Sequence, residues 1–141
     1  MRTRGDEGNA LVEFVYLAVV LMIPLVYVLI TVFQVQRAAF GTTEAARQAA
    51  RAYARAASVG QGQSQGQAAA ALVLKDQGIS SGATTRFTCS GGCLVPGSSV
   101  KVTVTYFVKL PLLGHVFGDR RRGTIRIQAS HTEHVDRFRS G

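Results

Sequence analysis

A polar leader followed by a long apolar run dominates the hydrophobic pattern of the chain. Residues 1–8 are mostly charged or glycine, whereas residues 14–33 contain no charged side chain. A run of about 20 apolar residues is what a helix needs to cross a bilayer. It is also longer than the apolar part of a typical secretory signal, and no small-residue cleavage site follows it. The pattern therefore predicts a retained membrane anchor over about residues 10–33, inside one long helix of residues 9–58.

The second half of this predicted helix, after residue 37, is rich in alanine and amphipathic. Glu44, Arg47, Arg51 and Arg55 recur at spacings of three and four residues, which places them on one side of a helix. Glu44 is positioned to pair with Arg47 or Gln48. The opposite side is expected to pack on the globular part through Phe40, Ala46, Ala50, Tyr53 and Ala57.

Beyond the long helix, the period of the pattern changes twice. Residues 59–66 are almost entirely Gly, Gln and Ser, which predicts a flexible linker. A short helix is expected over residues 67–77, with Gly78 ending it. After Gly78 the helical period is replaced by a two-residue period, which is typical of strands.

Three segments show this strand pattern. Between residues 100 and 109, four valines and a tyrosine alternate with mostly polar residues, which predicts a half-buried antiparallel strand. Residues 84–89 are expected to pair with it, with Phe87 facing inward, and residues 124–135 form a third candidate strand. The predicted class is α+β: a long N-terminal transmembrane helix continuing into an amphipathic helix, a short helix and a small three-stranded antiparallel sheet, with residues 67–141 as the globular part.

Composition adds a basic charge to this picture. The 141 residues include 16 Lys and Arg against 8 Asp and Glu, for a formal net charge of +8. An anionic partner follows as one expectation, whether lipid head groups, nucleic acid or an acidic wall polymer. The densest basic cluster is Arg120, Arg121 and Arg122 at a predicted turn, which is either a solvated tip or an anion contact. No interleaved aromatic residues support binding of single-stranded nucleic acid.

The two cysteines, Cys89 and Cys93, enclose Ser-Gly-Gly, and a pair around a glycine turn can reach disulfide geometry. In an oxidising compartment the bridge is expected to close, with two reduced thiols as the alternative. A metal site is not expected. His131 and Glu133 would share one face of a strand while His134 points to the other, so the two imidazoles could not chelate one ion.

Catalytic motifs are missing from the chain. There is no Gly-x-Ser-x-Gly elbow and no His-Glu-x-x-His pair, and the glycine-rich residues 60–66 lack the Lys and Ser/Thr of a phosphate-binding loop. We therefore expect no enzyme activity and no cofactor.

Glu13 is the one charge at the start of the apolar run, five residues after Gly8. A buried charge costs about 2.5–3.5 kcal/mol at the bilayer centre and less near its edge. In the simplest interpretation Glu13 belongs to an ordinary anchor and reaches the head groups. Alternatively the leader is cut after Gly8, and the new amine of Asn9 pairs with Glu13 of its own or a neighbouring chain, which lowers the cost of burial. The arrangement resembles a type IV prepilin leader.

The resemblance extends to one family. Gly8, then Asn-Ala-Leu-Val-Glu-Phe and a Val/Leu-rich span, resembles the TadE-like minor pilins of the Flp/Tad (type IVc) pilus system. Residues 102–106, 110–114 and 124–130 resemble the strand, apolar loop and strand that end that family. The resemblance implies cleavage after Gly8 by a prepilin peptidase, Asn9 as the mature N-terminus, and Glu13 and Phe14 as assembly residues. It also implies other Tad pilins and the Tad membrane platform as partners. Whether the role is that of TadE or of its paralogue TadF stays open.

Topology gives conflicting signals. The leader has only Arg2 and Arg4, whereas Arg37, Arg47 and Arg51 follow the apolar run, and this count favours a cytoplasmic C-terminal part. Access of a prepilin peptidase to the leader requires the opposite orientation, and the cysteine pair suits the outside. We therefore expect a single-pass protein of the bacterial cytoplasmic membrane with an extracytoplasmic domain, able to enter a cell-surface pilus. The alternative function is an unprocessed, membrane-tethered basic module that binds DNA or a surface polymer.

Overall fold

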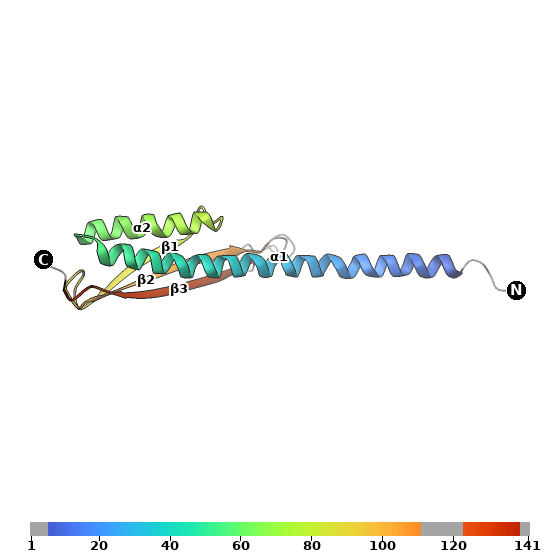
Figure 1. Cartoon of the computed structure of the whole chain (residues 1–141). Coiled ribbons are helices and arrows are strands. Elements are labelled where there is room, and N and C mark those ends of the chain that lie inside the picture. The colour runs from blue at the N-terminus through green and yellow to red at the C-terminus, as the bar shows by residue number, and fades with distance from the viewer. Residues whose placement is uncertain (1–5, 111–122, 139–141) are drawn as a thin grey trace. The chain divides into compact units, whose positions relative to one another are not determined.

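The computed structural model describes residues 6–110 and 123–138, and for residues 6–9 only the helical backbone. Its elements are, in chain order, α1 (Asp6–Arg55), α2 (Val59–Asp76), β1 (Thr84–Ser90), β2 (Ser99–Lys109) and β3 (Thr124–His134) (Figure 1). The chain divides into two compact units, Met1–Phe33 and Gln34–Gly141, and α1 contributes to both. The predicted α+β class is confirmed.

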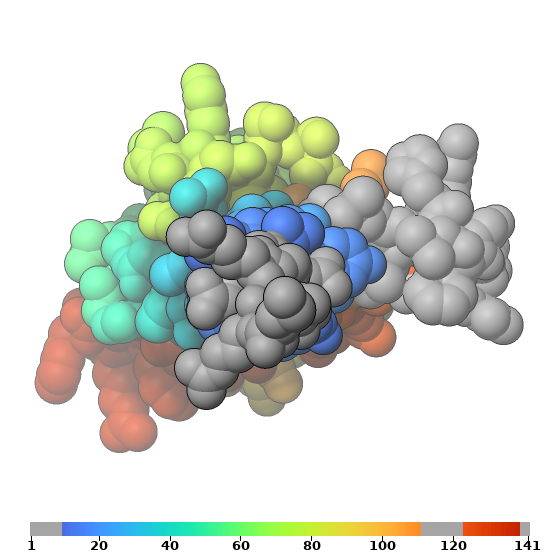
Figure 2. Space-filling model, turned by 90° about the vertical axis from the view of Figure 1, so that its right-hand side faces the viewer, coloured from blue at the N-terminus to red at the C-terminus, as the bar shows by residue number. Residues whose placement is uncertain are grey.

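The core of the second unit lies between the two helices and one face of the sheet. Helix α1 supplies a row of small side chains, and β2 supplies the valines opposite them. Within this unit α2 and β3 lie on opposite sides of α1, as Figure 1 and the view along the helix in Figure 2 both show. The buried hydrophobic residues that α1 and β2 contribute are Ala38, Ala45, Ala46, Ala49, Ala50, Tyr53, Val100, Val102, Val104 and Val108.

The predicted packing side of α1 was correct in its centre and wrong at both ends. Ala46, Ala50 and Tyr53 are buried, but Phe40 is 74% exposed and Ala57 is exposed as well. Phe40 lies two residues from the buried Ala38, and two residues turn an α-helix by about 200°. Ala57 lies beyond the last residue of α1. The pairing expected of Glu44 is present, with its carboxylate 2.6 Å from the Gln48 amide nitrogen and 3.8 Å from Arg47.

The expectation of a flexible linker over residues 59–66 was wrong, because these residues form the first half of α2. Every fourth residue of α2 is buried, and three of the four carry little or no side chain: Gly62, Gly66, Ala70 and Leu74. A Cβ on Gly62 would lie 3.1–3.3 Å from three atoms of the Tyr53 ring. Each glycine costs about 1 kcal/mol of helix propensity relative to alanine. Here tertiary packing offsets that cost, because only glycine lets α2 come this close to its neighbours.

Local signals set both ends of α2. At its start, the Ser58 hydroxyl accepts a hydrogen bond from the backbone N–H of Gln61, and the Gln61 side chain accepts one from Ala57. This is a variant of the capping box that Ser-x-x-Gln indicates. At its end, Gly78 has a φ of +75° and donates to the Lys75 carbonyl, while Ile79 donates to the Leu74 carbonyl. These two bonds form a Schellman motif, as expected of a glycine at this place.

The sheet has the order β1-β2-β3, with both neighbouring pairs antiparallel. Phe87 lies opposite Val102, and Val102 lies opposite His131. The register therefore places these three residues, one from each strand, on the same face of the sheet. The even-numbered residues of β2 face the helices, which confirms the predicted strand and its orientation. The predicted partner strands are also present, with bounds that differ by one residue at their C-terminal ends.

Candidate functional site

The apolar first half of α1 is the most unusual surface of the chain. Nearly all of its large hydrophobic side chains between Leu11 and Phe33 are exposed, and Leu11 itself is 67% exposed. The helix is long and apolar enough to cross a membrane, with a mean hydropathy of 2.7 over its most apolar window. Soluble proteins rarely leave so large an apolar surface open, and such a surface is typical of a segment that lies in lipid or against other protein.

Glu13 lies at the N-terminal end of this apolar segment. Its side chain is exposed, and among the described residues no basic side chain forms an ion pair with it. Phe14, which follows it, is 72% exposed. Among the described residues, therefore, a carboxylate without an ion-pair partner and an aromatic ring lie next to each other on an exposed part of α1. A cationic group on another molecule would stabilise Glu13 in an apolar environment.

Gly8 and Asn9, the expected processing residues, lie in the first turn of α1. The helix begins at Asp6, three residues before the predicted start, so the Gly8–Asn9 bond belongs to helical backbone. The first four N–H groups of a helix have no partner within the helix. The backbone around Gly8 and Asn9 therefore has fewer hydrogen bonds within the helix than the middle of α1 has.

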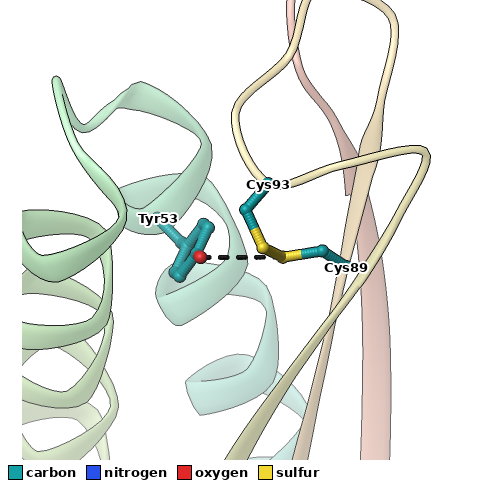
Figure 3. The surroundings of a disulfide bond; sticks show 3 residues. All are labelled: Tyr53, Cys89 and Cys93. Carbon is teal, nitrogen blue, oxygen red and sulfur yellow. Dashed lines mark hydrogen bonds between the residues drawn. A yellow bond between two sulfur atoms is a disulfide. The ribbon is translucent and has the colours of Figure 1, made fainter.

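The cysteine pair forms a disulfide at the end of β1, with a Cα–Cα distance of 5.3 Å. The Tyr53 hydroxyl points at the bridge and lies 3.6 Å from the Cys89 sulfur (Figure 3). The Tyr53 ring also stacks on Phe87, with ring centres 5.3 Å apart. The disulfide is thus attached to the core through a residue of α1. Gly91 and Gly92, between the cysteines, have φ values of +78° and +96°, which explains why the turn contains glycine.

The remaining predicted sites have separate outcomes. His131 and Glu133 do share a face, and their side chains lie 3.3 Å apart. In residues 6–110 and 123–138 no three His, Cys, Asp or Glu side chains are grouped closely enough to hold a metal ion. Arg120, Arg121 and Arg122, the proposed anion contact, lie outside the described residues.

Comparison of the chain with protein-family models, curated proteins and solved structures found no match.

Sequence reasoning missed the packing role of Gly62 and Gly66. A signal for it was present, because Gly62, Gly66, Ala70 and Leu74 recur at intervals of four, as on one side of a helix. The glutamines between the glycines give the segment the composition of a flexible linker, and this composition favoured a linker over a helix.

Proposed function

We propose that this chain is a TadE-like pseudopilin or minor pilin that acts in assembly of a Flp/Tad pilus. In this proposal a prepilin peptidase cuts after Gly8, and α1 anchors the protein in the bacterial cytoplasmic membrane with its sheet domain outside. The exposed half of α1 then packs laterally against other Tad pilins and the membrane assembly platform. The role is structural, with no catalytic step and no cofactor.

The observation that carries the proposal is the uncovered apolar half of α1 with Glu13 at its start. Leu11 and Phe14, on either side of Glu13, both have exposed side chains among the described residues. A plain anchor requires only apolar residues. An acid that follows the expected cleavage site by five residues is instead suited to meet the amine that cleavage creates, because opposite charges lower each other's cost of burial.

The first test is the intact mass and N-terminal sequence of the protein extracted from its native membrane. A chain that starts at Asn9 is the expected result, because it shows cleavage and an inside leader together. A chain that still starts at Met1 or Arg2, where an active prepilin peptidase is present, would overturn the proposal. That outcome would favour the alternative of an unprocessed, membrane-tethered module with an anionic ligand such as DNA or a surface polymer.

The second test concerns assembly. Glu13→Val should leave expression and cleavage intact and reduce incorporation into pili, because the mature amine loses its partner. Glu44→Val is the matched control, since it removes the same charge from the same helix at a position whose partners, Arg47 and Gln48, lie within the domain. Pili would be sheared, purified and quantified by immunoblot in a strain that lacks the native gene. Normal incorporation of the Glu13 variant would contradict an assembly role for this residue.

A further inference from the structure

The two faces of the sheet differ in charge. The inner face packs on the helices, and the outer face is formed by the alternate residues of each strand. All four Lys and Arg residues of the strands lie on this outer face, namely Arg86, Lys101, Lys109 and Arg126. The only acid in the three strands, Glu133, lies on the inner face opposite Val100. The Lys, Arg, Asp and Glu side chains on the outer face of the described strands are therefore all basic, which an anionic partner would complement.

A groove of about 420 Å³ crosses this face. Its floor is formed by Thr103 and Thr105 of the central strand. Arg86 lines it on the side of β1, and Arg126 on the side of β3. Thr84 and Gln128 complete the lining, and both lie opposite Thr105 in the register. The groove is thus built from side chains of all three strands.

The polar groups of the groove are available to a ligand. Among the described residues Arg86 takes part in no ion pair. Arg126 donates one hydrogen bond to the side-chain amide oxygen of Gln128, which leaves the Gln128 amide nitrogen as a donor. The hydroxyls of Thr103 and Thr105 can each donate and accept. The groove therefore offers cationic donors at its sides and groups of both kinds on its floor.

The spacing of the basic residues on this face favours a long ligand over a small anion. Arg86 lies opposite Thr103, and Arg126 lies opposite Phe107, two strands away and four residues along. Strand separation and rise per residue place their backbones about 17 Å apart. The basic residues as a group spread further, because Lys101 and Lys109 are eight residues apart on β2, about 27 Å along the strand, which is more than one small anion can span. Lys101 and Lys109 extend the same basic track at its two ends, so the ligand that fits is an extended chain with repeated negative charges.

We infer that this groove binds an acidic polysaccharide. Carboxylates of the polymer pair with Arg86 and Arg126, for which a guanidinium is well suited. Sugar hydroxyls donate to and accept from the threonine floor, and the exposed ring of Phe107, next to Arg126, offers an apolar surface for a sugar ring. Single-stranded nucleic acid fits less well, because its binding sites stack successive bases on several aromatic residues. Phe107 is the only aromatic residue on the outer face of the described strands.

Binding would be measured with the full chain in nanodiscs of zwitterionic lipid, at physiological ionic strength, by calorimetric titration. Polygalacturonate is the probe, dextran the neutral polysaccharide and oligo-dT the nucleic-acid comparison. The variant Arg86→Gln/Arg126→Gln should bind polygalacturonate at least about tenfold more weakly, since it loses two charge-assisted contacts. The control Arg51→Gln/Lys75→Gln removes two exposed charges from the helices and should stay within about twofold, since it leaves these contacts intact.

A second variant tests the floor without changing charge. Thr103→Val/Thr105→Val should weaken polygalacturonate binding, with the fold of each variant checked by circular dichroism. Four results would each overturn the inference: no binding of polygalacturonate, equal losses in the two charge variants, an unchanged affinity in the threonine variant, or tighter binding of oligo-dT through the same arginines. None of these results depends on cleavage at Gly8, so the inference and the proposed pilin role succeed or fail separately.

Discussion

Gly66 is the position where the packing of α2 can be tested most directly. A Cβ placed there would lie 2.7 and 2.9 Å from two ring atoms of Phe87 and 3.1 Å from the Ala49 carbonyl oxygen. The ring of Phe87 cannot swing away freely, because it stacks on Tyr53, and the carbonyl belongs to the backbone of α1. Gly66→Ala therefore forces the elements apart or distorts the ring.

The magnitude follows from two opposing effects. In an open helix, alanine is more stable than glycine by about 1 kcal/mol. Overpacking a well-filled core costs about 1–3 kcal/mol. Gly60 of the same helix gives the reference, because a Cβ there meets nothing within 4 Å. We expect Gly60→Ala to stabilise the domain and Gly66→Ala to be less stable than Gly60→Ala by the overpacking cost alone.

The assay is thermal and denaturant unfolding of the full chain in detergent, followed by the circular dichroism signal of the sheet. For a domain of this size, 1 kcal/mol shifts Tm by about 4–8 °C, so the gap between the two variants is well above experimental error. If Gly66→Ala stabilises the protein as much as Gly60→Ala does, α2 does not pack this closely on Phe87 and Ala49, and the packing explanation for the glycines fails.

Two further changes in the domain have defined outcomes. Replacing Cys89 and Cys93 with serine should lower the free energy of unfolding by about 2 kcal/mol, because the bridge closes only a short loop. Denaturant unfolding with and without reductant measures this loss. A wild-type protein whose unfolding is unchanged by reductant would contradict a stabilising role for the disulfide. Ser58→Ala should cost about 1 kcal/mol through loss of the N-cap, whereas Ser58→Asn should retain most of the stability, and equal losses in both variants would rule out capping as the cause.

The strands and the long helix could be predicted because their signals are local. The alternation of apolar and polar residues between 100 and 109 indicates a half-buried strand without any knowledge of the rest of the fold. In the structure, β2 has that pattern of burial. The basic outer face could have been inferred from the same alternation, since Lys101 and Arg126 are on the polar phase of their strands. The groove between Arg86 and Arg126 could not, because it requires the strand order and the register of both pairs.

Helix α2 was predicted only in part because glycine has two opposite uses. In an exposed segment it favours flexibility, and between closely packed helices it permits contact. Residues 60–66 have the composition of the first case and the spacing of the second, and composition alone cannot separate them. Phe40 shows that residue type alone is also insufficient for a large apolar side chain. Its type favours the core, but its position on the helix relative to the buried Ala38 places it on the exposed side.

The alanine row of α1 has a consequence for how this sequence can change over time. Alanine has no side-chain rotamers, so burying Ala45, Ala49 and their neighbours costs no side-chain entropy, and the contact has no adjustable parts. A core of leucines can accept a change at one position by shifting rotamers at the next. A seam of alanine and glycine has no such freedom, and any larger residue must move a whole helix. The alanine-rich stretch of α1 should therefore tolerate the fewest mutations in the domain. Saturation mutagenesis of residues 38–53 would show intolerant positions at intervals of three and four residues.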